Sequence, residues 1–323
     1  MGLRLGLLST ANINRLIVAA ARASDDVDVV AVASRDAGRA DDYAREHGIE
    51  RAHGSYEALL ADPEVDAVYV SLPNALHVDW SVQALEAGKH VLCEKPLART
   101  AAEAERAFDA AETTGLVLAE AFMYRHHPQT QLVASLVADG AIGELRALRA
   151  SFSFPLADAG NVRLQPDLDG GSLMDVGCYC VSGMRLHAGE PERVTAQQVL
   201  APSGVDIAFA ATLRFRGDVI GTFHSSMALP QRQGLELLGS EATLVVEAPW
   251  RVDFGGDVLL VRDRRAEQVP VPAADAYLLE LEHFAAAVAG EREPLIGRRD
   301  AVGQARALEA LHAAAERGEE VSP

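Results

Sequence analysis

Between residues 3 and 119 the chain alternates regularly between short apolar runs and stretches with helical periodicity. Apolar runs of strand length occur at 3–8, 27–33 and 67–71, and each is followed by apolar residues spaced three and four apart. Strands that alternate with helices usually run parallel, because the crossover helix returns the chain to the same end of the sheet. The alternation therefore predicts an α/β fold with a doubly wound parallel sheet, which binds ligands at the carboxyl ends of its strands.

The alternation stops at Glu120–Gln129, and beyond it candidate strands follow one another with few helices between them. Several of these strands, such as 145–154, alternate polar and apolar residues as half-exposed antiparallel strands do. Because 323 residues suffice for two cores, we expect a Rossmann domain over 1–121 and an α+β domain with a large, mostly antiparallel open sheet over 122–323. A sheet face without helices would suit a subunit interface, so we also expect a homodimer or higher homo-oligomer.

The composition excludes several classes of partner. A net charge of -18 repels phosphates at long range, so we expect no nucleic acid and no anionic membrane as partner. No apolar run reaches membrane length and the start does not have the pattern of a signal peptide, which favours a soluble, cytoplasmic protein. Three cysteines, Cys93, Cys178 and Cys180, are too few for a disulfide framework or a zinc site, so we expect free thiols and no metal.

The turn after the first apolar run matches a dinucleotide-binding turn only in part. It reads Gly-x-x-x-x-Ala from Gly6 to Ala11, with Leu8 where a glycine normally lets the pyrophosphate approach the backbone. The helix predicted to follow, 12–23, can still offer N–H groups to an anion, and Ser9 and Thr10 can cap it. Without further context the turn fits a plain strand–helix connection equally well.

The second predicted strand ends in Ser34-Arg35-Asp36, where an NAD enzyme usually has a carboxylate for the ribose hydroxyls. A hydroxyl and a guanidinium instead suit a 2′-phosphate, so NADP is favoured over NAD. The alternative is that Arg35 is an ordinary loop arginine while Asp36 caps the helix 37–47.

A short apolar run in 88–97, Gly-Lys-His-Val-Leu-Cys-Glu-Lys-Pro-Leu, ends abruptly in an acid, a base and a proline. The chain has only two lysines, Lys89 and Lys95, which suggests that lysine is used where an ammonium with a shiftable pKa is needed. Lys95 is the better candidate of the two. The alternative is that Glu94 and Lys95 are surface charges at the end of a strand.

This string closely resembles the signature of the Gfo/Idh/MocA family (glucose-fructose oxidoreductase, inositol dehydrogenase, rhizopine catabolism). The resemblance implies that the lysine is a catalytic residue beside the nicotinamide and takes part in the proton transfer. It also implies that the Lys-Pro bond is often cis. The sequences at 9–13 and at 73–77 resemble the same family. Together these stretches imply cofactor contacts from Gly6, Ser9, Thr10, Ala11, Asn12, Ile13, Ser34, Arg35, Leu72, Pro73, Asn74, His77, Glu94, Lys95 and Pro96. Without the resemblance, Asn74 reads as a helix N-cap and His77 as a first-turn histidine.

The second half carries its polar candidates in Gly-Gly-Ser-Leu-Met-Asp-Val-Gly-Cys-Tyr, 170–179. On a helix Asp175 and Tyr179 share a face, but Ser172 with Asp175 also reads as a capping box and Tyr179 as a core tyrosine. The string is similar to the family branch of dimeric dihydrodiol dehydrogenases and NADP-linked xylose dehydrogenases, where a lysine, an aspartate and a tyrosine surround the reacting carbon. The resemblance thus implies Lys95, Asp175 and Tyr179 as catalytic residues, and substrate contacts from Tyr124, Arg125, His126, Asn161 and Arg163.

We therefore expect an NADP-dependent oxidoreductase that transfers a hydride between nicotinamide and a CH–OH carbon of a sugar. The leading reaction is oxidation of an aldose, such as D-xylose or D-glucose, at C1 to a lactone. A ketosugar reductase and a trans-dihydrodiol dehydrogenase are alternatives, as is a regulatory protein that senses NADP on the same fold. Either Tyr179, made more acidic by Lys95, or Lys95 itself would take the proton.

Overall fold

The computed structural model describes residues 2–158 and 160–323, and internal contacts divide them into two compact units. The first unit comprises the chain up to Ala98 together with Ala102–His126 and Asp275–Val302. The second comprises Arg99–Ala101, His127–Ala274 and Gly303–Pro323. The units are thus interleaved in sequence. The domain ranges 1–121 and 122–323 remain a prediction, and the division by internal contacts is described separately from them.

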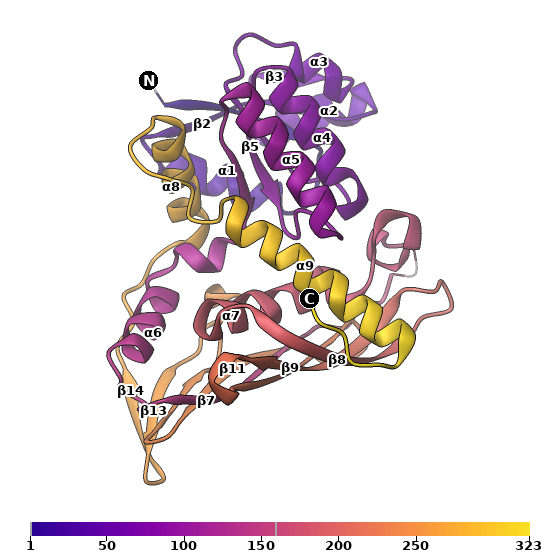
Figure 1. Cartoon of the computed structure of the whole chain (residues 1–323). Coiled ribbons are helices and arrows are strands. Elements are labelled where there is room, and N and C mark those ends of the chain that lie inside the picture. Colours follow the sequence, from indigo (N-terminus) through magenta and orange to yellow (C-terminus); the bar gives the residue numbers. More distant parts are fainter. Residues whose placement is uncertain (1, 159) are drawn as a thin grey trace. The chain divides into compact units, whose positions relative to one another are not determined.

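The described part of the first unit contains a six-stranded parallel sheet in the order β3-β2-β1-β4-β5-β6. Figure 1 labels β2, β3 and β5 of this sheet. This order, with its reversal between β1 and β4, confirms the predicted doubly wound sheet. Its strands are β1 (Leu3–Leu8), β2 (Val27–Ala33), β3 (Arg51–His53), β4 (Ala67–Val70), β5 (His90–Glu94) and β6 (Leu118–Ala121). Its helical segments are α1 (Asn14–Ala23), α2 (Ala37–Glu46), α3 (Tyr56–Leu60), η1 (Asn74–Leu76), α4 (His77–Glu86), α5 (Ala101–Thr114), η2 (Met123–His126) and α8 (Ala276–Val288).

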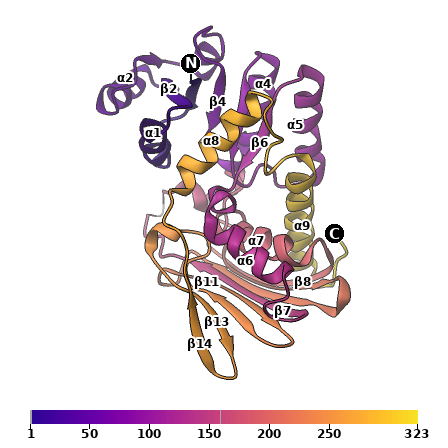
Figure 2. The same ribbon diagram turned by 90° about the vertical axis from the view of Figure 1, so that its left-hand side faces the viewer.

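The strands of this sheet are buried on both faces, as continuous apolar runs require. Leu5 and Leu7 of β1 and Val68 and Tyr69 of β4 are fully buried. Although α8 comes late in the sequence, it packs against α1 and η2 of this unit (Figure 2). The first unit is therefore completed by a distant segment.

The described part of the second unit contains an eight-stranded sheet in the order β14-β13-β12-β11-β7-β10-β9-β8. Among the described strands of this sheet, only β7 and β10 pair in parallel, so the predicted, mostly antiparallel sheet is confirmed. Its strands are β7 (Leu145–Ser153), β8 (Pro191–Leu200), β9 (Asp206–Phe215), β10 (Ile220–Ser226), β11 (Arg232–Gly239), β12 (Thr243–Val246), β13 (Val258–Arg262) and β14 (Arg265–Val269). Its helices are α6 (Pro128–Ala138), α7 (Cys178–Ala188) and the later part of α9 (Arg298–Arg317).

One face of this sheet is covered and the other is exposed at its centre. Leu213 of β9 and Phe223 of β10 are buried on the face that α7 packs against, and Figure 2 shows α6 and α7 on one side of the strands. Thr212 and Thr222, which pair across the same two strands, are exposed. This alternation is the one predicted for a half-exposed sheet.

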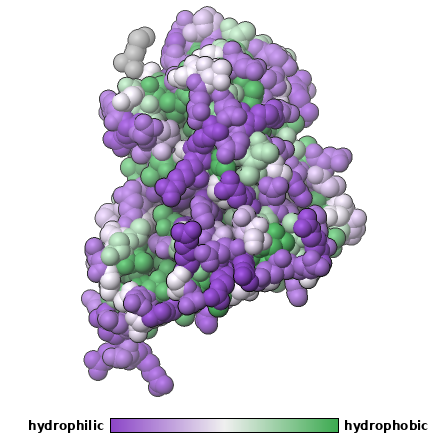
Figure 3. Space-filling model, viewed as in Figure 1, coloured by the Kyte–Doolittle hydropathy of each residue, from purple (hydrophilic) through white to green (hydrophobic). Residues whose placement is uncertain are grey.

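We did not predict β14 from the sequence. Its residues Arg265–Val269 are mainly polar, and 262–268 are exposed, so neither alternation nor an apolar run marks it. Figure 3 shows the tip of the β13–β14 hairpin as a mainly hydrophilic surface. The strand owes its place to backbone pairing with β13, which depends little on side chains.

Two features of the described residues bear on function. None of the helices they form has the length and apolar character to cross a membrane. Nor do the described histidines, cysteines and acidic residues gather in threes or more as a metal ion would need. Cys93, Cys178 and Cys180 are buried free thiols, as expected.

Candidate active site

The turn after β1 is held by its own polar groups. The Ser9 hydroxyl donates to the Ser71 carbonyl at 3.0 Å and accepts from the Ala11 N–H at 3.1 Å, while the Asn14 amide donates to the Ser9 carbonyl at 2.7 Å. Capping by Ser9 and Thr10 was a wrong prediction, because α1 begins at Asn14 with Ile13 as its N-cap residue and no side-chain cap. The N–H groups of Asn14, Arg15 and Leu16 donate to the carbonyls of Ala11, Asn12 and Ile13, so an anion at this turn would be bound by the N–H groups just before α1.

Two details of this turn concern the cofactor. Leu8 is the fully buried last residue of β1, so its side chain lies in the core of the first unit. Asn14 is also fully buried, and its Oδ1 has no hydrogen-bond partner among the described residues. A buried amide oxygen without a donor is unusual, and a ligand hydroxyl or ordered water at this turn would satisfy it.

The end of β2 brings two arginines to the same turn. Asp36 caps α2, accepting from the Arg39 N–H at 3.1 Å, as the alternative interpretation predicted. Arg35 is exposed and forms a side-chain hydrogen bond with Tyr56. The Arg39 guanidinium donates to Thr10 Oγ1 at 3.3 Å. Burial raises the pKa of Tyr56, and the positive charges of Arg35 and Arg39 oppose that rise.

Arg39 is a candidate that the sequence analysis missed. It follows Arg35 by four residues in the first turn of α2, and this spacing would have been enough to consider it. Tyr56 also packs edge-on against Trp80, with ring centroids 4.9 Å apart. The charges of both arginines thus act on the hydroxyl of Tyr56, and the ring of Tyr56 is held by its contact with Trp80.

His77 connects the loops that follow β4 and β5. Its Nδ1 lies 2.8 Å from the Pro96 carbonyl oxygen and its Nε2 lies 2.8 Å from the Leu72 carbonyl oxygen, and the residue is 1% exposed. Both oxygens can only accept, so both contacts are hydrogen bonds only when each ring nitrogen carries a hydrogen. Asn74 is not an N-cap, because Pro73 occupies that position before η1 and provides no side-chain cap.

The stretch from Glu94 to Leu97 is fixed by carboxylates. Glu94 accepts from the Tyr69 hydroxyl and, at 3.2 Å, from the Lys95 N–H. The Lys95–Pro96 bond is cis, as the resemblance implied, and the Leu97 N–H donates to Glu120 at 2.8 Å. Lys95 is half-buried, at the carboxyl end of β5. Glu94 and Lys95 are therefore half-buried, and the backbone that carries them is hydrogen-bonded to carboxylates.

Tyr124, Arg125 and His126 of η2 lie in the interior of the first unit. The Arg125 guanidinium pairs with Asp300 at 3.1 Å, and the His126 ring lies 5.0 Å from that of His283. Burial, then the charges of His283 and Arg125, lower the pKa of His126 to about 3. Their predicted contacts with substrate stay a prediction.

In the second unit the structure brings Asn161, Arg163 and Asp175 together. The Asn161 side chain accepts from the Arg163 N–H at 3.1 Å, and Arg163 Nε donates to Asp175 Oδ2 at 2.8 Å. Gly170 makes this possible, because an added Cβ would lie 2.4 Å from the Arg163 carbonyl oxygen. The loop before the candidate aspartate is thus packed backbone against backbone.

The segment that carries Asp175 is a π-helical turn, Leu173–Gly177, followed by α7. Ser172 has helical backbone angles and donates to Asp206 Oδ2 at 2.7 Å, while the Leu173 N–H donates to the same oxygen at 2.8 Å. The capping box of Ser172 with Asp175 was therefore a wrong prediction. The cap is a buried carboxyl from β9.

Tyr179 lies in the first turn of α7, with its ring near two other aromatic rings. The centroid of Phe152 on β7 is 5.4 Å away and that of Trp250 is 6.2 Å away. Trp250 can approach because an added Cβ at Gly183 would lie only 2.5 Å from its ring. Residues four apart share a face on an α-helix, but a π-helical turn is wider than an α-helical one. The predicted common face of Asp175 and Tyr179 therefore does not apply directly to this segment.

The two units thus offer complementary chemistry. The first has a helix start without a side-chain cap, two arginines, and a half-buried lysine that follows a carboxylate in the sequence. The second has a carboxylate oriented by an arginine and a phenol fixed by aromatic rings. Such groups can bind a phosphorylated dinucleotide and move a proton at a hydroxyl or carbonyl group.

Two family models match the chain. The model described as "Oxidoreductase family, NAD-binding Rossmann fold" matches residues 4–122, and the "GFO/IDH/MocA C-terminal domain" matches residues 130–245. Together they span more than half of the chain.

Three known proteins are similar over most of their length. A D-xylose 1-dehydrogenase (NADP(+)) of Haloferax volcanii is 40% identical over 97% of this chain and 97% of its own. A trans-1,2-dihydrobenzene-1,2-diol dehydrogenase of Xenopus laevis is 36% identical over 73% of each chain. The crystal structure of a 3-ketoreductase from Actinomadura kijaniata with NADP and TDP-benzene matches with a TM-score of 0.92, 35% identity and coverage of 97% and 98%.

Proposed function

The chain belongs to the Gfo/Idh/MocA family of oxidoreductases, and we propose that it is an NADP-dependent dehydrogenase acting on a sugar CH–OH group. The leading reaction is oxidation of an aldose, such as D-xylose or D-glucose, at C1 to the lactone. The similarity to the xylose dehydrogenase supports this reaction. The observation that carries the proposal is the orientation of Asp175 by Arg163 one turn before Tyr179.

The first unit supports NADP as the cofactor. The uncapped start of α1, with Asn12 and Ile13, would hold the pyrophosphate. Arg35 and Arg39, with the hydroxyl of Thr10, would hold the 2′-phosphate, which two guanidinium groups recognise better than a diol. The bound cofactor supplies the hydride acceptor at its nicotinamide.

Other cofactor contacts follow the same proposal. The remaining predicted contacts lie in or next to the turn after β1 and the loops after β2, β4 and β5. They are Gly6, Ser9, Ala11, Ser34, Leu72, Pro73, Asn74, His77, Glu94 and Pro96. His77 would keep two of these loops at a fixed separation through the Leu72 and Pro96 carbonyls.

We assign the proton transfer to Lys95 and Tyr179, and the orientation of the substrate to Asp175. Oxidation of an alcohol requires loss of its proton as the hydride leaves, and an isolated phenol with a pKa of about 10 is a poor base at neutral pH. An ammonium group near the phenol stabilises the phenolate, which gives Lys95 a role whether or not it takes the proton itself. Asn161 and Arg163 would position the sugar through the loop that also orients Asp175.

A 3-ketosugar reductase is the second candidate, supported by the similarity to the A. kijaniata 3-ketoreductase. The two reactions use the same groups in opposite directions, since the acid of the reduction is the base of the oxidation. A trans-dihydrodiol dehydrogenase would use them in the same way on a different ring.

A substrate screen tests the proposal. The pure protein is incubated with NADP and aldoses, inositols or cyclic diols while NADPH absorbance is followed, and then with NADPH and the keto products. Reduction of NADP by an aldose is expected. Turnover with keto sugars alone would favour the reductase, and binding of NADPH without turnover of any compound would favour the NADP-sensing regulator.

We further propose that the protein forms a homodimer or higher homo-oligomer through the exposed face of the second sheet. Thr222 stands at the centre of this face, between Thr212 of β9 and Arg149 of β7. Thr222→Glu should reduce the mass measured by light scattering, because a symmetric interface would place its like charges together. Thr113→Glu on α5, exposed in the first unit, is the control. A monomeric wild type at micromolar concentration would contradict the proposal.

We propose the cytoplasm as its location. Its buried thiols, Cys93, Cys178 and Cys180, are compatible with a reducing compartment.

A further inference from the structure

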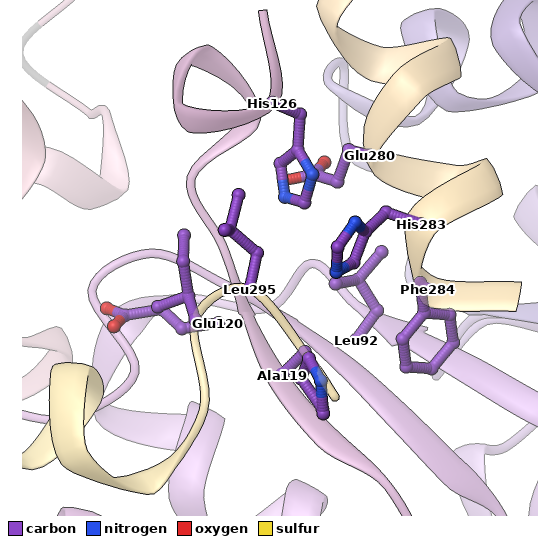
Figure 4. A pocket seen from close by; sticks show the side chains of 10 residues that line it. Leu92, Ala119, Glu120, His126, Glu280, His283, Phe284 and Leu295 are labelled. Carbon is purple, nitrogen blue, oxygen red and sulfur yellow. The ribbon is translucent and has the colours of Figure 1, made fainter. Parts of the chain in front are cut away.

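The interior of the first unit contains a carboxyl group that the proposed reaction does not use, that of Glu280 on α8. Glu280 is 1% exposed, and its Oε1 has no hydrogen-bond partner among the described residues. It lines a small pocket with Leu92, His126 and His283 (Figure 4). Burying an ionised carboxylate without donors is costly, so this carboxyl group needs an explanation.

Strand geometry relates Glu280 to Glu94. Leu92 and Glu94 are two residues apart on β5, so their side chains point to the same face of the sheet, and Leu92 lines the pocket with Glu280. Tyr69 of β4 is the register partner of Leu92, and its hydroxyl donates to Glu94. The two carboxyl groups and the Tyr69 hydroxyl therefore form one cluster beneath α8.

The hydrogen bonds decide which carboxyl group is ionised. Glu94 receives two donors, the Tyr69 hydroxyl and the Lys95 N–H, whereas the structure gives none to Oε1 of Glu280. Burial, and then the charge of Glu94, raise the pKa of Glu280 well above its ordinary value. Burial and the two carboxyl groups also raise the pKa of Tyr69, so its hydroxyl keeps its hydrogen. Different surroundings thus give two neighbouring carboxyl groups different protonation.

We propose that Glu280 and Glu94 form a pair that carries a single negative charge, with the proton on Glu280 and the charge on Glu94 beside Lys95. The functional part rests on the role of Lys95 proposed above, and Glu280 is a positioning residue within it. A second ionisation, at alkaline pH, would add a buried negative charge near Lys95 and make its ammonium hold its proton more tightly.

The other titratable groups around Glu280 do not replace this effect. His126 of η2 is neutral near pH 7, because burial lowers its pKa to about 3. Arg125 is paired with Asp300, and Glu120 of β6 accepts from the Leu97 N–H. His283 and Tyr277 come from α8 itself, where the His283 ring faces the Glu293 carbonyl at 3.1 Å.

Infrared difference spectroscopy tests the protonation directly. At pH 7 the wild type minus Glu280→Gln should show a carboxylic-acid C=O band that shifts in D₂O, and the wild type minus Glu282→Gln should not, since Glu282 is a half-buried glutamate on the same helix. In Glu94→Gln the band should disappear at a lower pH than in the wild type, because the neighbouring charge is gone. Absence of the band at pH 7, or an unchanged titration in Glu94→Gln, would overturn the proposal.

The effect on Lys95 has its own measurement. Lys89 and Lys95 are the only lysines, so ¹³C reductive methylation gives at most two lysine NMR signals, and Lys89→Arg assigns them. The Lys95 signal should titrate at lower pH in Glu280→Gln than in the wild type and in Glu282→Gln. Equal midpoints would overturn the coupling. Neither measurement needs turnover, so a failed substrate screen would count against the proposed function and leave this test intact.

Discussion

In the first unit the candidate residues stand at the carboxyl ends of parallel strands, whereas in the second they stand in a loop and a widened helical turn. Arg35, Asn74 and Lys95 follow β2, β4 and β5, so the topology of the sheet brings them to one edge. Asp175 and Tyr179 are placed instead by particular contacts, those of Arg163 and of the aromatic rings.

The difference suggests that the units respond differently to substitution. In the first unit, side chains at strand ends contribute little to the sheet that holds them, so function and stability should separate. In the second, the contacts that place the site also hold the fold together, so the two should change together.

The largest expected effect is on catalysis, where the units should behave alike. Lys95→Met in the first and Tyr179→Phe in the second should each lower kcat by about 10²–10⁴-fold, the usual worth of a positioned acid–base group. The double variant should be little worse, because the two groups act together. Steady-state kinetics with the substrate from the screen measures this.

Two variants control for this experiment. Tyr43→Phe removes a hydroxyl that has no partner among the described residues. Lys89→Arg retains the positive charge of the other lysine, which donates to the Asp62 and Val65 carbonyls and is not among the candidate site residues. Both should retain turnover. Near-wild-type turnover in Lys95→Met would leave the Glu94-Lys95-Pro96 stretch as a structural strand end and favour the regulator.

The second prediction tests whether function and stability change together in the second unit. Asp206→Ala removes the buried carboxyl group that accepts from the Ser172 hydroxyl and the Leu173 N–H, so the fold should lose about 2–4 kcal/mol in denaturant unfolding. The same change should lower kcat, because it releases the turn that carries Asp175. Asp206→Asn keeps an acceptor oxygen and should lose less of both. Full stability in Asp206→Ala would argue against a placement by tertiary contacts.

The third prediction tests their separation in the first unit. Arg35→Ala should weaken NADP binding by about 1.5–3 kcal/mol, the scale of a charged hydrogen bond, and leave NAD binding nearly unchanged. Its unfolding free energy should change by no more than about 0.5 kcal/mol, as for ordinary surface positions. Calorimetric titration with both cofactors measures the first effect, with Arg45→Ala on the following helix, α2, as control. Equal losses for NADP and NAD would return Arg35 to the role of a loop arginine.

The smallest effect should again be shared, because each unit buries a histidine. Burial lowers the pKa of both His126 and His312 to about 3, with Arg99 adding to the effect on His312. In the unfolded chain a histidine has a pKa of about 6.5, so below that pH it binds a proton that the buried ring does not bind. Each of the two histidines should therefore lower the free energy of unfolding by about 1.4 kcal/mol at pH 5.5. Stability should therefore fall as pH decreases from about 6.5 toward 3. In His312→Phe that dependence should be weaker, and an unchanged pH profile of unfolding would contradict the assignment.

The same contrast explains what the sequence could predict. The parallel sheet, the arginine at the end of β2 and the lysine at the end of β5 follow from periodicity and strand ends, which are local in sequence. The cap from Asp206 to Ser172 joins residues 34 apart, and the sequence gives no sign of it. The π-helical turn and the polar strand β14 were missed for related reasons, since tertiary packing and backbone pairing decide them.

The two tryptophans of the chain are divided between the two candidate regions. Trp80 touches Tyr56, which lies against the arginines after β2, and Trp250 lies near Tyr179. The molecule therefore carries one intrinsic fluorophore for each half of its chemistry. Emission from a Trp250→Phe variant would report cofactor binding alone, and emission from Trp80→Phe would report events around the tyrosine, so the order in which ligands arrive can be observed without any added label.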